Sequence, residues 1–169
     1  MTKKDVYLLW WKDAEMQAIK DTLQKQWIEF RDAWLWWWAS IDKYKSQIAE
    51  IIQAWSTPVA LELVWASEID WVVDIDHHWE KSNNPATILQ VYERLWLNPD
   101  LKVRLIAWND IWYIPKMEKI LTQEWIIDPK VREDMIKEIR SLDREAQWIT
   151  QDMEKDAELK FNKLLTNLV

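Results

Sequence analysis

The only two histidines of this chain are adjacent, and they follow an apolar run that is typical of a buried strand. Residues 74–79 read Asp-Ile-Asp-His-His-Trp and come directly after Val72 and Val73. Side chains at the carboxyl end of such a strand lie at the edge where open α/β sheets bind ligands. Carboxylates and imidazoles together bind Mn²⁺, Fe²⁺ or Zn²⁺. The segment therefore predicts a metal site, and the alternative is a pair of surface or capping histidines.

Strand-like and helix-like runs alternate in the first half of the chain, and these elements would position the histidines. We expect strands at residues 6–9, 28–30, 58–64 and 72–75. Helical spacing predicts helices at 13–26 and at 41–54, the second of them capped by Ser40. The order β-α-β-α-β-β predicts an α/β fold with a mostly parallel sheet and helices on both of its faces.

The C-terminal third is expected to be helical. Asn84 before Pro85 is typical of an N-cap and a first helical position, which predicts a helix over 84–95. Three further helices are expected to open at prolines, namely Pro99 (to about Ala107), Pro115 and Pro129. An amphipathic run from Thr150 to about Leu168 predicts a last helix, with Ala157, Phe161, Leu164 and Leu165 on its apolar side. We expect one domain over 1–169, strand-rich at 5–80 and helical at 84–169.

The chain has sixteen tryptophans and no glycine, although average usage would give about 12 glycines. Trp27, Trp55, Trp96 and Trp125 each follow a helix-like run, where a left-handed residue, usually glycine, ends a helix. Other tryptophans fall at strand ends, at 10–11 and 34–38. We interpret these residues as glycine-to-tryptophan substitutions, and we expect left-handed backbone at the four helix ends. The alternative is an aromatic-rich carbohydrate or membrane-interface binder.

The charge and composition exclude several classes of function. The formal net charge is −7, the pI is about 4.9 and no basic run exists, so long nucleic acid is not an expected partner. The absence of cysteine excludes disulfides, thiolate zinc sites and cysteine nucleophiles. No apolar run reaches the roughly 18–20 residues of a membrane span. The N-terminal residues lead into a strand rather than a signal-peptide core, so a cytoplasmic location is expected.

The histidine segment and its surroundings resemble the DHH phosphoesterase superfamily. The resemblance rests on Asp76-His77-His78, on the Val-Val-Asp-Ile strand before it, and on Asn-Pro-Ala-Thr-Ile-Leu-Gln-Val-Tyr-Glu-Arg-Leu after it. That superfamily includes RecJ-type exonucleases, manganese pyrophosphatases and nanoRNases, and the similarity covers roughly residues 5 to 115. The chain departs from the pattern in lacking the leading histidine of the first motif and a second, substrate-binding domain.

The resemblance implies a set of metal ligands at matching positions. Asp13-Ala14-Glu15 matches the D-x-D element after the first strand, with Glu in place of the second Asp. Glu62 is the nearest match to the acid that ends the strand before the motif, and Asp110, within 107–112, matches the acid one helix beyond it. The implied metal ligands are Asp13, Glu15, Glu62, Asp76, His77 and Asp110. The implied cofactor is Mn²⁺ or Mg²⁺, as two ions about 3.5–4 Å apart.

Other residues would act on the substrate. His78 would face the phosphate as an acid or electrostatic group, and His77 would be a ligand or the direct partner of one. Arg144 would bind a phosphate through two hydrogen bonds, although an ordinary salt bridge is the simpler interpretation. Asn109 and Tyr113 would shape the pocket, and Tyr113 fits a plain core position equally well. The loop 34–38 would cradle phosphate through its backbone N–H groups, or it is a tight turn.

These inferences lead to one expected function and two alternatives. The expected function is a metal-dependent phosphohydrolase, of phosphodiesterase or pyrophosphatase type, that acts on a small phosphorylated compound or a short nucleotide. The first alternative is a non-catalytic binding or regulatory domain with a degenerate DHH site. The second is a tryptophan-rich scaffold or glycan binder. No membrane partner is expected, and assembly into a homo-oligomer is left open.

Overall fold

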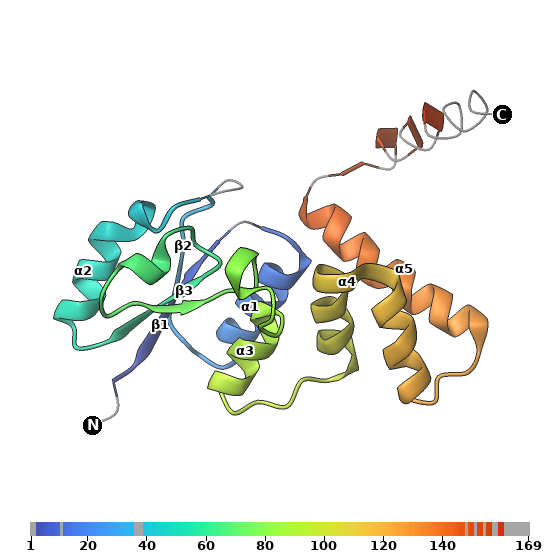
Figure 1. Ribbon diagram of the computed structural model, residues 1–169, viewed down its shortest axis with the longest axis horizontal. Helices are drawn as coiled ribbons and strands as arrows, with labels where there is room; N and C mark the ends of the chain where they lie inside the picture. The colour runs from blue at the N-terminus through green and yellow to red at the C-terminus, as the bar shows by residue number, and fades with distance from the viewer. Residues whose placement is uncertain are drawn as a thin grey trace.

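The computed structural model describes residues 3–10, 12–35, 39–147, 149–150, 152–153, 155–156 and 159–160 of the chain, without the side chains of Trp112 and Tyr113. Its centre is a parallel four-stranded sheet with the strand order β2-β1-β3-β4 (Figure 1). The strands are β1 (Asp5–Leu9), β2 (Phe30–Asp32), β3 (Thr57–Leu61) and β4 (Val73–Ile75). The expected α/β fold with a parallel sheet is therefore confirmed.

Helices connect the strands and cover the sheet. The α-helices are α1 (Ala14–Lys25), α2 (Lys45–Gln53), α3 (Thr87–Arg94), α4 (Leu101–Gln123) and α5 (Pro129–Ala146). Short 3-10 turns lie at η1 (Ile41–Tyr44), η2 (Ala66–Glu68) and η3 (Trp79–Lys81). Helix α2 lies on one side of the sheet, and α1 and α3 lie on the other (Figure 1). Right-handed connections between parallel strands explain this placement of α1 and α2. The connection from β1 to β2 and the connection from β2 back across β1 to β3 run in opposite directions along the sheet, so their helices lie on opposite sides.

Two hydrophobic clusters hold the molecule together. The larger joins the sheet to α1, α2 and α3, with Tyr7, Leu8, Val59 and Ala60 fully buried at its centre. The second lies where α4 and α5 run side by side, around Leu105, Met117 and Leu121 (Figure 1). The described part of the chain that follows the sheet is therefore mainly helical, as expected.

Several element boundaries differ from the expectation. Ala86, not Asn84, precedes the first turn of α3, because the Asn84 side chain donates to the backbone oxygen of Asp76. Asp100 caps α4 by accepting the Val103 N–H, so this helix begins two residues after Pro99. Strand β2 lies two residues later than the predicted run at 28–30. The predicted helix at 41–54 is divided between η1 and α2, with Ser40 as the cap of η1.

Helix α4 does not end near Ala107, and Pro115 does not open a new helix. Pro115 lies inside the continuous α4. An internal proline removes one backbone hydrogen bond and usually destabilises a helix by about 3 kcal/mol. Here Leu105 on one side of Pro115 and Met117 and Leu121 on the other are buried in the same cluster, and this packing keeps the helix continuous. Pro129 does open α5, after the cap Asp128. Most of the last predicted helix lies outside the described residues.

The tryptophans at helix ends adopt the left-handed backbone that is expected of them. The φ angles are 57° at Trp27, 57° at Trp55, 56° at Trp96 and 57° at Trp125. At each of these ends the next N–H bonds back to the carbonyl five residues before it, as from Ile28 to Leu23. This is the Schellman motif that glycine usually completes. These four side chains are 80–95% exposed, so they are not core aromatics.

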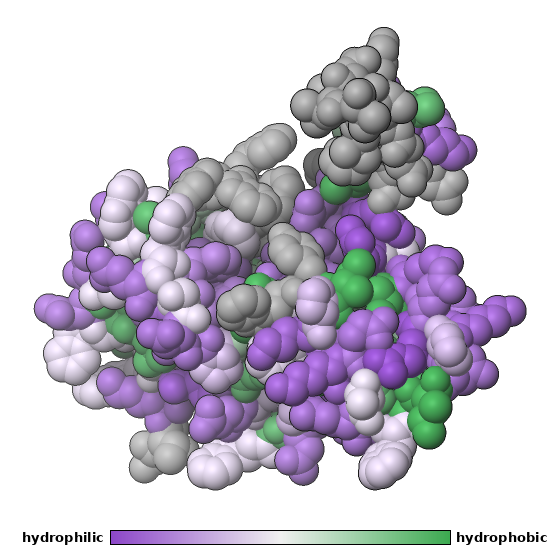
Figure 2. Space-filling view, turned by 45° about the vertical axis from the view of Figure 1, so that its right-hand side comes forward, coloured by the Kyte–Doolittle hydropathy of each residue, from purple (hydrophilic) through white to green (hydrophobic). Residues whose placement is uncertain are grey.

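The surface is mostly hydrophilic on the face shown in Figure 2, with apolar residues in separate patches. None of the helices in the described part of the chain is both long and apolar enough to cross a membrane.

Candidate metal centre

The candidate site lies where the strand connections diverge. The chain leaves β1 toward β2 on one side, whereas β3 lies on the other side of β1. Ligands bind in the crevice at such a switch point of an open α/β sheet. Asp13 and Glu15 follow β1, Glu62 follows β3, and His77 follows β4. Asp110 reaches the same place from the middle of α4.

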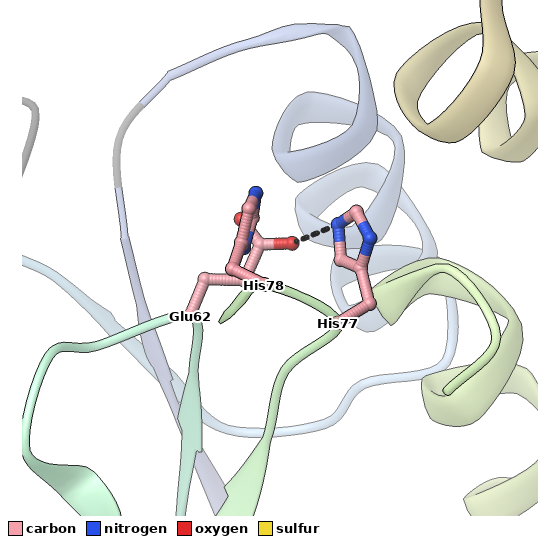
Figure 3. A group of neighbouring side chains, drawn as sticks. All are labelled: Glu62, His77 and His78. Carbon is pink, nitrogen blue, oxygen red and sulfur yellow. Dashed lines mark ion pairs between the residues drawn. The ribbon is translucent and has the colours of Figure 1, made fainter. Parts of the chain in front are cut away.

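Four side-chain atoms meet at this crevice. They are Oε2 of Glu15, Oε1 of Glu62, Nε2 of His77 and Oδ2 of Asp110, and they all lie within 4.8 Å of one another. The His77 nitrogen is central, at 2.8 Å from Asp110, 3.1 Å from Glu62 and 3.8 Å from Glu15. Figure 3 shows Glu62 and His77 pointing toward one another from the ends of neighbouring strands.

The four atoms are buried and have no hydrogen bond of good geometry. The side chains of Glu15 and Glu62 are 1% and 2% exposed, and that of His77 is 6% exposed. Buried polar atoms without partners are costly, so each requires an explanation. Three carboxylate oxygens and an imidazole nitrogen are a donor set for a divalent cation. Ligands at about 2.2 Å from an ion lie up to about 4.4 Å apart, so small shifts would close this group around one.

The backbone holds Glu15 and Glu62 in place. The N–H of Ile88, in the first turn of α3, donates to Oε1 of Glu15 at 3.0 Å, which leaves Oε2 for the site. Glu62 has a φ of 54°, and it is the only residue besides tryptophans with positive φ in the described part of the chain. Left-handed backbone at a residue with a Cβ costs roughly 1–2 kcal/mol. Such strain clusters at functional sites, and here it places the Glu62 carboxylate.

The electrostatics of the centre favour a bound cation. Burial, and then the charges of Asp110 and Glu62, raise the pKa of Glu15 well above its usual range. Burial and the nearby Glu62 do the same to the pKa of Asp13. Burial opposes protonation of His77, but its contacts with Asp110 and Glu62 outweigh burial and raise its pKa to about 10. Carboxylates gathered in a buried place repel one another, and a positive charge among them relieves that repulsion.

Asp76 and His78 form a second unit beside the four atoms. Oδ1 of Asp76 accepts the backbone N–H of His78 and also contacts Nδ1 of its ring, both at 2.9 Å. Hydrogen bonding to Asp76 raises the pKa of His78, and the same contacts lower the pKa of Asp76 although burial opposes this. Lys81 pairs with Asp74 and lies 3.6 Å from Asp76. The Asp76 carboxylate is therefore turned to His78 and Lys81.

A cleft of about 960 Å³ opens beside this unit. Its walls include Glu62, Asp76, His78 and Lys81. The ring of His78 is half exposed there, and its centre lies 4.3 Å from that of the buried His77 ring. The cleft therefore gives a ligand access to His78 and to the edge of the four-atom group.

The remaining predicted site residues lie in different places. Asp13 is buried and caps α1, where its Oδ1 accepts the Met16 N–H at 2.7 Å. Asn109 is buried in α4 next to Asp110. Arg144 lines a groove between α4 and α5 rather than the cleft. The Tyr113 side chain and residues 36–38 of the loop 34–38 lie outside the described residues.

Asp143 is a site residue that sequence reasoning misses. This half-buried residue of α5 accepts the N–H of Ala14 at 3.5 Å, directly beside Asp13. Burial raises its pKa, and the charge of Asp110 adds to the effect. The only signal in the sequence is its place in the polar run 143–147, where Arg144 is the more obvious candidate for binding a phosphate.

Comparison of the chain with family models, with curated proteins and with solved structures finds no match. The functional interpretation therefore depends on the geometry of the centre.

Proposed function

We propose that this protein is a metal-dependent phosphohydrolase, of phosphodiesterase or pyrophosphatase type, for a small phosphorylated compound or a short nucleotide. The observation that carries the proposal is the group of four buried potential ligand atoms, which come from separate elements and lie within 4.8 Å of one another. Burial of three carboxylates beside one imidazole costs free energy, which a bound cation would offset. Glu15, Glu62, His77 and Asp110 would hold a divalent ion, Mn²⁺ or Mg²⁺.

The ion would supply Lewis-acid polarisation of a phosphoryl group and ease the deprotonation of water. The protein's own residues have distinct tasks around it. Glu15 and Glu62 are fixed by α3 and by the strained end of β3, so their oxygens keep their positions when a substrate binds. The buried position of His77 keeps bulk water from the inner side of the group. Preorganised charge of this kind stabilises a transition state without reorganisation.

His78 would act on the substrate from the cleft. Asp76 contacts Nδ1 of its ring, which leaves Nε2 for a ligand. This contact raises the pKa of His78, so it favours the protonated ring. A protonated imidazole can hydrogen-bond to a phosphate oxygen and give its proton to the oxygen of the leaving group. Asp76 would keep the ring oriented during that transfer.

The acidic surroundings favour a small substrate. The walls of the cleft carry Glu62, Glu68, Asp74, Asp76 and Glu80, with Lys81 and His78 as the groups able to carry positive charge. The whole chain has a net charge of −7. A long polyanion would be repelled along this surface, whereas one phosphate close to the ion would be attracted. These charges support a compound with few phosphates.

A titration of the purified protein with Mn²⁺, followed by phosphatase assays, tests this proposal. Metal-free protein would be titrated by calorimetry and then assayed with bis(p-nitrophenyl) phosphate and with pyrophosphate. Glu62→Gln should weaken Mn²⁺ binding and abolish turnover. Glu133→Gln is the matched control, because Glu133 is an exposed glutamate paired with Lys137 on α5. Hydrolysis that persists in Glu62→Gln, or a wild type that binds no Mn²⁺, would contradict the proposal.

One observation favours the alternative of a non-catalytic binding domain. Two of the six expected ligands, Asp13 and Asp76, lie outside the four-residue group and accept other hydrogen bonds. One ion would then bind where hydrolysis of the expected type uses two. A single Mn²⁺ per chain, with unhydrolysed phosphate compounds bound in the cleft, would support this alternative.

A further inference from the structure

An open groove runs along α4 and α5, separate from the cleft at the metal centre. Its volume is about 570 Å³. Ile136 lines it as a buried residue, whereas Ile114 and Ile127 line it at 38% and 76% exposure. Exposed apolar side chains gathered along one groove are a feature of interaction sites. The groove follows most of α5, from Ile127 before the helix to Arg144 in its last turn.

The charges along this groove are mainly positive. Its charged lining residues are Arg132, Lys137, Arg140, Arg144, Glu118 and Glu133. Arg132 pairs with Glu118, and Lys137 pairs with Glu133. Arg140 is exposed and makes no ion pair with a residue that the structure describes. An apolar segment with acidic residues along its flank would therefore fit the groove in both hydrophobicity and charge.

The last amphipathic run of the chain, residues 150–168, has this pattern. Apolar residues recur in it every three or four positions, at Met153, Ala157, Phe161, Leu164 and Leu168. This spacing is that of an apolar stripe on a helix. Glu154 and Glu158 each follow a residue of the stripe, so they would flank it on one side. The described residues between 152 and 160 are all exposed and stand clear of α4 and α5 (Figure 1).

The length of the run and of its connection match the groove of the same chain. Helix α5 has 18 residues, which is about 27 Å at a rise of about 1.5 Å per residue. Residues 150–168 would span about 28 Å as a helix. The connection consists of residues 147–149, and loops of this length join antiparallel helices. The N–H of Ile149 bonds back to the carbonyl of Arg144 at 2.9 Å, a hydrogen bond typical of a helix end where the chain turns.

The antiparallel register that this connection sets also brings matching side chains together. In that register Glu154 and Glu158 lie on either side of Arg140 along α5. Phe161 lies beside Ile136, the buried apolar residue of the groove. Carboxylates close to a guanidinium form strong, charge-assisted hydrogen bonds. The acidic flank and the apolar stripe of the run therefore meet the basic and the apolar parts of the groove at the same time.

We propose that residues 150–168 form a helix that packs back into the groove between α4 and α5 of the same chain. The three helices would make an antiparallel bundle in which the apolar stripe covers Ile114 and Ile136. A short connection holds the run near its own groove at an effective concentration on the order of mM, so this groove is filled before that of a second copy. The inference does not depend on the proposed function.

Hydrogen exchange of the full chain, followed by mass spectrometry, tests the docking. The amides of residues 150–168 should exchange at least about 10-fold more slowly than those of a free peptide of the same sequence. Arg140→Glu places like charges opposite Glu154 and Glu158 and should reduce this protection several-fold. Adding Glu158→Arg to that variant should restore it. Lys130→Glu is the matched control, because Lys130 is an exposed residue of α5 that does not line the groove. Exchange as fast as in the peptide, or protection that Arg140→Glu leaves unchanged, would overturn the inference.

An engineered disulfide locates the docked run, because the chain has no cysteine of its own. The antiparallel register places Leu168 beside Ile127. Ile127→Cys combined with Leu168→Cys should therefore form a disulfide within one chain on mild oxidation, since this bond requires Cα atoms within about 7 Å. Lys130→Cys combined with Leu168→Cys is the control and should form little of it. Equal yields from the two pairs would overturn the inference. Disulfide-linked dimers as the main product would also overturn it, because the run would then occupy the groove of a second copy.

Discussion

The Nε2 atom of His77 lies 2.8 Å from Oδ2 of Asp110, and this contact joins the sheet to the helical part of the chain. His77 follows β4 and belongs to the sheet edge, whereas Asp110 lies in the middle of α4. The two residues would bind the same ion, so metal binding would also hold α4 against the sheet. Metal binding at the centre would in this way be linked to the stability of the fold.

Asp110→Asn should reduce Mn²⁺ affinity by more than about 100-fold, because loss of even an outer partner of a ligand costs about 10- to 100-fold. The same change should remove the stabilisation that Mn²⁺ gives to wild type in thermal unfolding, since a ligand stabilises only the state that binds it. Calorimetry and melting curves with and without Mn²⁺ measure both effects. Asp134→Asn, at an exposed position on α5, is the control. An unchanged affinity in Asp110→Asn would remove this residue from the centre.

Without metal, the protein should become less stable as the pH rises. Contacts with Asp110 and Glu62, against the effect of burial, raise the pKa of His77 from 6.5 to about 10 in the folded state. A raised pKa contributes stability that is complete below the unfolded value and is lost as the pH passes the folded value. The contribution of His77 should therefore disappear between pH 6.5 and about 10. The raised pKa of Glu15 acts in the same direction at lower pH.

Melting temperatures in the presence of a chelator check this prediction. Wild type should lose more stability than His77→Ala between pH 6.5 and 10, so that the two curves converge at the alkaline end. Parallel curves over that range would mean that His77 does not titrate as its contacts require.

His78→Ala should lower turnover by about 100- to 1,000-fold, the range for loss of one group that stabilises charge in a transition state. Mn²⁺ affinity should change little. Asp76→Ala should follow the same pattern more weakly, because Asp76 contacts His78 and lies outside the four-atom group. Steady-state kinetics with bis(p-nitrophenyl) phosphate, paired with calorimetry, separate the two effects. Loss of Mn²⁺ binding in Asp76→Ala would instead make this carboxylate a ligand, as its place in the sequence motif implies.

Replacing Trp27, Trp55, Trp96 or Trp125 by glycine should stabilise the protein. Each has left-handed backbone and an exposed side chain, so the change relieves strain and exposes little new apolar surface. The free energy of unfolding should rise by about 0.5–1 kcal/mol per site. This is the steric cost that glycine removes, minus the greater conformational entropy that glycine gives to the unfolded chain. Trp108→Gly is the control. Trp108 lies in the interior of α4 and packs against the second hydrophobic cluster, so glycine should destabilise the helix there. Chemical denaturation measures all five variants, and a loss of stability at the four helix ends would contradict the interpretation of these tryptophans.

The sheet and the place of His77 at its edge can be predicted from the sequence for a physical reason. Strands are short apolar runs, and the polar residue that follows each of them must reach the same edge of a parallel sheet. His77 follows such a run, and at that edge it meets Glu15 and Glu62, which the resemblance implies as ligands. The extent of α4 could not be predicted, because it depends on packing of Leu105 and Met117 on both sides of Pro115.

Residues brought to the centre by helix packing are harder to predict. Asp143 reaches Ala14 only because α5 packs against α1, and nothing local distinguishes it from the neighbouring polar residues. The types of Asp76 and Asn84 predict a ligand and a helix cap. The Asp76 carboxylate contacts His78 in the structure, and its role as a ligand stays a prediction. Asn84 does not cap α3, because its side chain donates to the backbone of Asp76.

An anomalous-difference map from crystals of the protein grown with Mn²⁺ tests the metal centre most directly. We predict a strong peak bonded to Glu15, Glu62, His77 and Asp110, at about 2.0–2.2 Å from their ligand atoms. Crystals of Glu62→Gln should lack that peak. A wild-type map with no peak among these four residues, or with Mn²⁺ bound only elsewhere, would contradict a metal centre at this edge of the sheet.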